Sequence, residues 1–328
     1  MGIKALGYVA VETARPDQWD RFLTQLVGAM RAPDAAGATL LGTRTRVNPE
    51  LATFANGTAC RMLEGNDVFP GGGHPSDCIP AVIAAAEVVG ADAATVLTGI
   101  VAAYEVYASV FAATRVRDRG FDYVVYTAAG SAAGAARVMG CDVERTREAL
   151  ALAITANLGL ASTRRGHVSI WKNLAGPNAA RNGLFAAMLA REGITGPPAA
   201  IGGVHGLAEI AGRYTPPLLP SREGGYAIER ADIKSLLTEF HSQAPILCAI
   251  ELRRQIIDAG LGIDAIAAVR VETYAYSLKE LASDREKWRP PNHESADHSL
   301  PYLVAAALMD GEFGARTFAP ERFTDSAM

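Results

Sequence analysis

The sequence predicts a mainly α-helical protein with a large all-helical domain and a smaller, truncated α/β lid domain. Two patterns lead to this fold class. From residue 48 to residue 192 the chain is rich in Ala, Leu and Gly, and its apolar residues recur with the helical period. Residues 202–228 are rich in Gly and Pro, and the region after them mixes helical patterns with one strand-like pattern. A chain of 328 residues is long enough for two domains of the usual ~100–200 residues.

The helical pattern divides into separate segments that end at turn signals such as Gly140 and Gly193. Dense alanine lets helices approach closely, so we expect a bundle with small residues at its helix interfaces. Helices are expected at residues 48–63, 80–89, 94–114, 125–139, 143–160, 177–192, 243–259 and 299–309.

Two segments have the character of strands. Residues 3–10 run apolar and precede a helical pattern that contains Trp19 and Phe22. Residues 263–274 end with Val269, Val271 and Thr273 alternating against charged residues, which predicts a strand. A single strand cannot form a sheet, so its partners are expected to be absent or to come from elsewhere.

Composition excludes several classes of function. The net charge is −4 and no basic tract is present, which argues against nucleic acid and anionic membrane surfaces as partners. The first residues do not resemble a signal peptide, and no run approaches the ~20 apolar residues of a membrane span. The cysteines lack the short paired spacing of a zinc site or a disulfide framework. We therefore expect a reduced, cytoplasmic protein without a metal or other cofactor.

The segment from Asn56 to Glu87 holds the densest group of chemically active side chains. Pro75 and Asp77 are explained by a helix start, where proline fits the first turn and the helix dipole favours an acid, but this leaves His74 unexplained. Carboxylates crowded beside a histidine are typical of a site that separates an acid from a base, although charges after a helix are often merely solvated. The polar residues here are Glu64, Asn66, Asp67, His74 and Asp77.

Further candidates follow later in the chain. Arg164, Arg165 and Lys172 lie in a polar break and would hold carboxylates, unless the break is an ordinary surface loop. A second group, Lys234, Glu239 and His241, offers a cation, an acid and an imidazole, but the same stretch also fits helix capping.

Other motifs point away from competing chemistries. Tyr302 opens the last expected helix, where a core tyrosine with a satisfied hydroxyl is the commoner case. The sequence has neither a phosphate loop nor a dinucleotide fingerprint, and it lacks the Gly-x-Ser-x-Gly elbow of many serine hydrolases.

Ten segments in the same order resemble the MmgE/PrpD family of 2-methylcitrate dehydratases, which includes cis-aconitate decarboxylase. The resemblance covers residues 36–325, and its segments include Arg61-Met-Leu-Glu-Gly-Asn-Asp, Gly73-His-Pro-Ser-Asp and Ala296-Asp-His-Ser-Leu-Pro-Tyr. The others are residues 49–59, 104–106, 119–122, 171–172, 193–197, 233–234 and 239–243.

The resemblance implies a helical domain and a lid with the active site in the cleft between them, and a homodimer. Two positions depart from the decarboxylase pattern: Val68 stands where a threonine is expected, and Asp122 where a histidine is expected. An acid at the second position is similar to dehydratase-like members. The family's active-site positions fall on Glu64, Val68, His74, Asp122, Lys172, Lys234, Glu239 or His241, and Tyr302.

The two ends of the chain differ from that family. The first 28 residues resemble the opening βα element of extradiol dioxygenases of the vicinal oxygen chelate superfamily, without any of that family's iron ligands. The chain stops at Met328, before most strands of the lid that the family implies, so a fused or truncated reading frame is expected. The predicted domains are residues 1–28, 29–228 and 229–328.

The resulting hypothesis is a metal-independent carbon–oxygen lyase that dehydrates or hydrates a small hydroxy polycarboxylate of the 2-methylcitrate type. Lys172 and Lys234 would bind carboxylates and stabilise the charge that forms when an α-proton is removed. His74 or Asp122 would be the base, and Tyr302 or His241 would protonate the leaving hydroxyl. Substrate contacts are expected from Glu64, Asn66, Asp67, Arg164, Arg165 and Glu239.

Two alternatives belong to other classes. The first is a catalytically impaired homologue that serves as a helical dimer or a ligand-binding scaffold. The second is an extradiol dioxygenase, which only the first 28 residues suggest.

Overall fold

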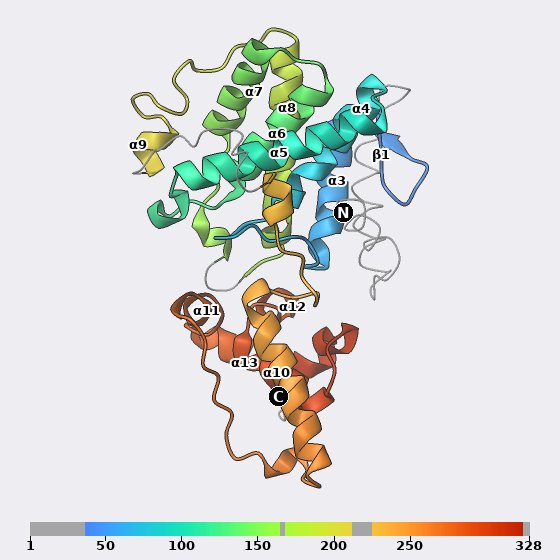
Figure 1. Ribbon diagram of the computed structural model, residues 1–328, viewed down its shortest axis with the longest axis vertical. Coiled ribbons are helices and arrows are strands. Elements are labelled where there is room, and N and C mark those ends of the chain that lie inside the picture. Colours follow the sequence, from blue (N-terminus) through green and yellow to red (C-terminus); the bar gives the residue numbers. More distant parts are fainter. Residues whose placement is uncertain (1–36, 165–167, 212–224, 324–328) are drawn as a thin grey trace. The chain divides into compact units, whose positions relative to one another are not determined.

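A computed structural model describes residues 37–164, 168–211 and 225–323, and Figure 1 shows their helices. The chain divides into two compact units. The first unit comprises residues 1–163 and 171–233, and the second comprises residues 164–170 and 234–328. Both are built mainly from helices, which confirms the predicted fold class. The predicted strand and helix within residues 1–28 lie outside the described residues.

The first unit is a helical bundle with one short hairpin. The hairpin pairs β1 (Ala38–Thr39) with β2 (Arg46–Val47) in antiparallel fashion. Some helix starts carry side-chain caps: Asp92, for example, accepts a hydrogen bond from the Thr95 N–H at 2.8 Å. The helices are α3 (Pro49–Met62), α4 (Ile79–Val89), α5 (Ala93–Ala113), α6 (Val124–Val138), α7 (Val143–Ala156), α8 (Trp171–Arg191) and α9 (Leu207–Ala211), with 3-10 turns η1 (Pro75–Cys78), η2 (Val116–Arg119), η3 (Ala161–Arg164) and η4 (Ala227–Arg230).

Helix α8 begins earlier than predicted, at Trp171 instead of residue 177. Proline usually ends or opens a helix, yet Pro177 lies inside this one. Its ring packs against α3 at Gly57, where an added Cβ would lie only 3.1 Å from the Pro177 Cβ. This close packing offsets the lost backbone hydrogen bond. As a consequence, Lys172 and Asn173 lie on the first turn of a helix and not in a polar loop.

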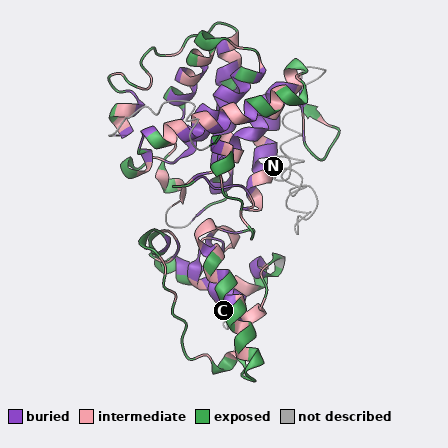
Figure 2. Cartoon of the chain, in the orientation of Figure 1, coloured by how far each residue is buried: buried purple, intermediate pink, exposed green. Residues whose placement is uncertain are grey.

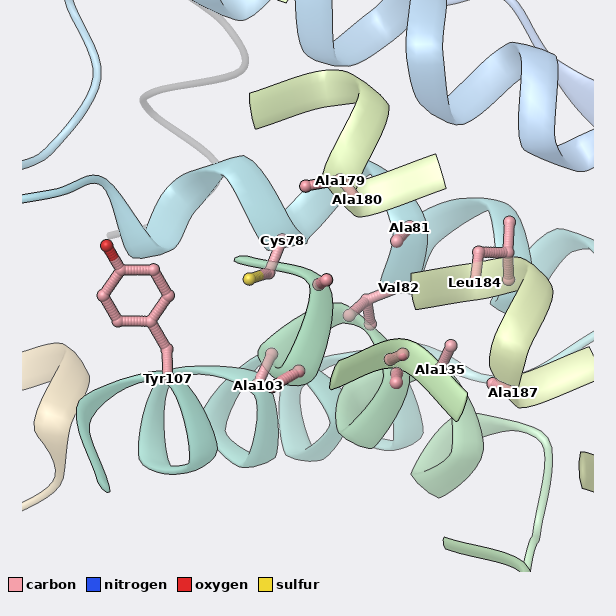
Figure 3. Packing of buried hydrophobic residues seen from close by; sticks show 14 of the residues in the cluster. Cys78, Ala81, Val82, Ala103, Tyr107, Ala135, Ala179, Ala180, Leu184 and Ala187 are labelled. Carbon is pink, nitrogen blue, oxygen red and sulfur yellow. The ribbon is translucent and has the colours of Figure 1, made fainter. Parts of the chain in front are cut away.

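Helix α6 lies in the core of the first unit and packs against both α5 and α8. All of its residues except Arg137 are buried, and the helices of this unit carry most of the buried surface in Figure 2. At the crossing with α5, a Cβ added to Gly134 would lie 2.8 Å from the Gly99 carbonyl oxygen. Figure 3 shows the small side chains Ala103 and Ala135 in this core. The predicted small-residue interfaces are confirmed.

The second unit has a small core of its own, built around Ile246, Leu281 and Leu303. Helix α10 packs against α13, and both were predicted within one or two residues of their observed ends. The elements are η5 (Phe240–Ser242), α10 (Gln243–Asp258), η6 (Ile263–Ala265), α11 (Ala275–Leu281), η7 (Arg285–Trp288), α12 (His293–Ala296), α13 (Leu300–Asp310), η8 (Ala315–Phe318) and η9 (Pro320–Phe323).

The strand predicted over residues 263–274 is wrong. This segment opens with the turn η6 and continues without regular structure to Tyr274. A β-strand requires a hydrogen-bonded neighbour, and the described part of the second unit contains no strand. The alternation of valines with charges instead belongs to an irregular segment that is only partly buried. Val271 packs against the small core of the second unit, while Val269 is exposed.

Helix α5 also corrects the expectation that no segment approaches the length of a membrane span. Among the described residues it is the one helix long and apolar enough to cross a membrane, judged by length and composition. One such helix is weak evidence, because the core helix of a soluble protein passes the same test. Here α5 packs along α6 and buries Tyr104 and Tyr107 against the bundle.

Gly73 should be intolerant of any side chain. It has a positive φ of 83°, and an added Cβ would lie 1.8 Å from the Tyr107 hydroxyl oxygen. Gly73→Ala should lower the free energy of unfolding by ~3 kcal/mol or more, from backbone strain and overpacking together. Urea denaturation followed by circular dichroism measures the change.

Gly42 provides the matched control, because it has the same φ of 83° but no atom within 4 Å of an added Cβ. Gly42→Ala should cost only the backbone term, ~1 kcal/mol. Adding Tyr107→Phe to Gly73→Ala should recover part of the loss. Equal losses in the two glycine variants would contradict the packing described for Gly73.

Candidate active site

Residues 64–77 form a tightly folded segment that follows α3 and runs into η1. It contains the three consecutive glycines Gly71, Gly72 and Gly73, all with positive φ. The turn is closed by the Gly72 N–H, which donates to the Phe69 carbonyl at 2.8 Å, and Val68 bridges to Asp232. Pro75 occupies the first turn of η1, which confirms the predicted helix start. The glycines let the chain reverse so that Glu64, Asp67, His74 and Asp77 belong to one compact region.

A buried ion pair joins this segment to helix α8. The Lys172 Nζ lies 2.9 Å from the Glu64 Oε1, and the two side chains are 1% and 4% exposed. Buried charges of this kind are normally paired, because desolvating a lone ion is costly. Glu64 also has a positive φ of 50°, a backbone conformation that costs of order 1–3 kcal/mol for a residue other than glycine. Strained residues of this type cluster at functional sites, so the pair is the centre of the candidate site.

Arg61 adds a second buried cation on the last turn of α3. Its Nη2 lies 3.7 Å from the Glu64 Oε1 and its Nε lies 4.0 Å from the Asp77 Oδ1. Burial by itself would lower the pKa of Arg61, but Tyr123 and the carboxylates of Asp77, Glu64 and Asp122 outweigh burial and raise it. The guanidinium is therefore charged at every working pH.

Asp67 organises the other side of the segment. Its carboxylate accepts hydrogen bonds from the Tyr104 hydroxyl at 2.8 Å and from the Ser76 N–H at 3.0 Å. Its backbone carbonyl contacts the His74 Nδ1. A carbonyl oxygen can only accept, so Nδ1 carries the proton and Nε2 is the unprotonated nitrogen of the neutral ring. Burial, followed by the Asp67 charge, raises the pKa of Tyr104 well above its usual value, so this phenol stays a donor.

Asn66 and Asp77 lie where the segment meets α8. The Asn66 Nδ2 donates to the Asp77 Oδ1 at 3.3 Å. Gly176 makes room for this carboxylate, because a Cβ added there would lie 2.3 Å from the Asp77 Oδ2. The acid is therefore held against the backbone of the helix that carries Lys172.

Asp122 lies just before α6 and is buried. Its carboxylate accepts the Tyr123 N–H at 2.7 Å, and its own N–H donates to the Gly159 carbonyl at 2.7 Å. The Tyr123 ring stacks edge to face on His74 with centroids 5.7 Å apart. These contacts connect Asp122 to the same region as His74 and Arg61. No group of three or more His, Cys, Asp or Glu side chains among the described residues is arranged to hold a metal ion.

The second unit brings Glu239 and His241 together at η5, just before its first α-helix, and Lys234 lies at the start of this unit. Glu239 caps η5 by accepting the His241 N–H at 2.6 Å, and its Oε1 lies 3.8 Å from the His241 Nε2. Gln243 fixes the turn after Lys234, since its Oε1 accepts from the Leu236 N–H and its Nε2 donates to the Leu236 carbonyl. Glu239 therefore caps η5, whereas Ser242, which precedes α10 and was the residue expected to cap it, makes no side-chain capping hydrogen bond.

Tyr274, which no sequence pattern singled out, contacts His241 of this group. Its hydroxyl is hydrogen-bonded to the His241 Nδ1, and the two rings meet edge to face at 5.4 Å. Burial raises the pKa of the Tyr274 phenol. Tyr274 is the last residue of the segment predicted as a strand, so its approach to His241 had no local sequence signal.

The remaining predicted site residues are Tyr302, Arg164 and Arg165. The Tyr302 hydroxyl donates to the Thr317 carbonyl within the small core of the second unit, as expected of a core tyrosine. Arg164 ends η3, and Arg165 lies outside the described residues.

Two residues of the site, Arg61 and Tyr104, were not selected from the sequence although both belong to segments that carried the family resemblance. A signal existed for Tyr104, because it falls on the buried face of α5 together with Ile100 and Ala103. An aromatic hydroxyl on that face needs a buried acceptor, which Asp67 supplies.

Removing one charge of the Glu64–Lys172 ion pair should lower the free energy of unfolding more than removing both charges together. Glu64→Gln and Lys172→Met should each lower the free energy of unfolding by ~3–5 kcal/mol, because the remaining charge stays buried. The double variant should lose much less than the sum of the two. Chemical denaturation of the four proteins measures this coupling.

The exposed pair between Glu251 and Arg254 on α10 is the control. Glu251→Gln should leave stability unchanged within error, since an exposed pair contributes little. Additive losses at Glu64 and Lys172 would show that the two charges do not stabilise each other.

Comparisons with known proteins show similarity over most of the chain. The sequence matches the MmgE/PrpD N-terminal domain over residues 8–217 and the MmgE/PrpD C-terminal domain over residues 238–328. It is 26% identical to the 2-methylcitrate dehydratase of Escherichia coli O157:H7, over 97% of this chain and 66% of that protein. It is also 26% identical to the 2-methylcitrate dehydratase of Salmonella typhimurium, over 98% of this chain and 67% of that protein.

A mitochondrial 2-methylcitrate dehydratase of Yarrowia lipolytica is 25% identical, over 88% of this chain and 58% of its own length. The chain thus spans about two thirds of the length of the bacterial relatives and less of the yeast protein. The two matched domains together cover most of the sequence. The chain belongs to the MmgE/PrpD family.

Proposed function

We propose that the protein is a hydro-lyase that adds water to, or removes it from, a small hydroxy polycarboxylate, with 2-methylcitrate as the first candidate substrate. The observation that carries the proposal is the buried Glu64–Lys172 pair in the same compact region as His74, whose ring has a defined tautomer. The names of the three relatives support the same reaction class.

Elimination begins with removal of a proton from the carbon next to a carboxylate. The electron pair of that C–H bond first enters the carboxylate, which becomes a highly charged aci-carboxylate, and then forms the carbon–carbon double bond as the C–O bond breaks. The hydroxyl leaves as water after it gains a proton. Such a step requires a base near neutral pH and a cation at the developing charge.

His74 is the base that this arrangement favours. Its Nδ1–H is directed at the Asp67 carbonyl, so Nε2 is the nitrogen that takes a proton. Asp122 is the alternative base, but its carboxylate accepts the Tyr123 N–H and lies close enough to raise the pKa of Arg61. One of the Asp122 carboxylate oxygens is thus already engaged as a hydrogen-bond acceptor.

Lys172 is the cation for the developing charge, and Lys234 is proposed as a second carboxylate contact. Glu64 holds the Lys172 ammonium at 2.9 Å, and an ammonium has three N–H donors in total. The other proposed substrate contacts are Asn66, Asp67, Arg164, Arg165 and Glu239.

We also propose that the protein acts as a cytoplasmic homodimer.

His241 is proposed to protonate the leaving hydroxyl, with Tyr302 as the alternative. Glu239 lies 3.8 Å from the His241 Nε2 and favours the protonated ring. The Tyr302 hydroxyl instead donates to the Thr317 carbonyl, so it would have to break that hydrogen bond to act.

His74→Gln should reduce kcat/KM by ~10²–10⁴-fold, the usual contribution of a general base. Lys172→Ala should cause a loss of at least similar size while the helix content is retained. Turnover of 2-methylcitrate is followed by the absorbance of the new conjugated double bond. His205→Gln is the control, because this histidine is exposed and contacts only Glu209 among the described residues.

Wild-type activity in both His74→Gln and Lys172→Ala would end the proposal. Wild-type protein that binds citrate-like acids in calorimetry but turns over none of them would instead identify a ligand-binding scaffold.

A pair of tyrosine variants separates the two proposed proton donors. Tyr302→Phe should lose one buried hydrogen bond, ~1 kcal/mol of stability, and keep kcat within about threefold. Tyr274→Phe should lower kcat more, because it removes the partner of the His241 Nδ1. Steady-state kinetics and thermal unfolding of both variants test this, and a larger kcat loss in Tyr302→Phe would make Tyr302 the donor.

A further inference from the structure

Arg61 is a buried arginine with no role in the reaction as described. Its side chain is 1% exposed, although arginine is rarely fully buried without a close partner. Its nearest carboxylate oxygens are 3.7 Å and 4.0 Å away, which is beyond hydrogen-bond distance. Neither Nε nor Nη1 makes a hydrogen bond to any described residue. A purely structural arginine would be expected to use its donors more fully.

The position of Arg61 relative to the ion pair explains why it is present. Both Arg61 and Lys172 approach the same oxygen, Glu64 Oε1, at 3.7 Å and 2.9 Å. Glu64 directly follows the C-cap of α3 with a left-handed backbone, so its side chain is not aligned by helix geometry. Arg61, three residues earlier, is fixed by the last turn of that helix. A rigid cation thus lies beside the carboxylate that holds Lys172.

The two cations have different tasks at this carboxylate. The Arg61 guanidinium keeps its proton under all working conditions, so it is a permanent charge beside Glu64. Lys172 contacts the same oxygen at 2.9 Å, so any shift of the carboxylate would displace the anion that the ammonium contacts. The Arg61 charge opposes such a shift. Asp77, whose Oδ1 lies 4.0 Å from the Arg61 Nε, offsets part of the repulsion between Arg61 and Lys172.

We propose that Arg61 is a positioning residue that holds the Glu64 carboxylate in place, and through it directs the Lys172 ammonium. The role concerns the same site as the proposed function and rests on that function where turnover is measured. Because the contacts at 3.7 Å and 4.0 Å are charge contacts without hydrogen-bond geometry, charge and not the planar fork of the guanidinium is what the position requires.

This distinction is tested by the pair Arg61→Lys and Arg61→Met. Arg61→Met fills similar volume without charge, and it should lower kcat by ~10²-fold, the cost of a misplaced catalytic group, with KM changed less than threefold. Arg61→Lys should restore kcat to within about tenfold of the wild type. Arg181→Met is the matched control, since Arg181 is a partly buried arginine on α8 that contacts Asn182 and the Phe54 ring. Wild-type kcat in Arg61→Met, or equal losses in both Arg61 variants, would overturn the proposal.

A second measurement does not depend on turnover. Arg61→Met and Glu64→Gln should each lower the thermal unfolding midpoint by roughly 5–10 °C, and the double variant should lose less than the sum. This coupling is expected even if the wild type converts none of the acids tested, which would refute the proposed function alone. Additive shifts would overturn the role of Arg61.

Discussion

The ion pair between Glu64 and Lys172 is the constraint around which the first unit is arranged. Two charges that are 4% and 1% exposed can be kept inside a helical bundle only if each is held in the reach of the other. This requirement sets where α3 must end and where α8 must begin. Glu64 adopts a strained left-handed backbone and α8 runs through a proline, and both features place the two side chains against one another.

The small residues of the bundle serve the same requirement. Gly57 lets Pro177 approach α3, and Gly176 leaves room for the Asp77 carboxylate beside the start of α8. Polar groups that would otherwise be costly in a core are thereby brought together with their partners, as with Tyr104 and Asp67. The alanine-rich interfaces are therefore more than a packing device, because close helix approach is what lets a charged cluster be enclosed without exposure to water.

Much of this could be predicted from the sequence. Helical periodicity gave the main helices of both units, and the dense polar stretch at residues 64–77 pointed to a site. The start of α8 could not be predicted, because Pro177 is locally a helix breaker and its close packing against Gly57 is a contact between distant segments. The prediction of a strand at residues 263–274 was wrong for a related reason. Alternating apolar and charged residues are a property of one segment, but a β-strand also needs a neighbouring strand to pair with. Tyr274 and Arg61 were missed because their roles depend on contacts across the fold, to His241 and to Glu64 and Lys172, that no local pattern contains.

Proton removal at a carbon next to a carboxylate, assisted by His74 and Lys172, is the step on which the whole interpretation depends. Nuclear magnetic resonance of 2-methylcitrate incubated with the purified protein in D₂O tests it most directly. We expect the substrate signals to decrease while signals of an unsaturated tricarboxylate grow, and we expect neither change with His74→Gln. A spectrum that stays constant with the wild-type protein, while the acid is bound, would contradict the assignment of this chain as a hydro-lyase.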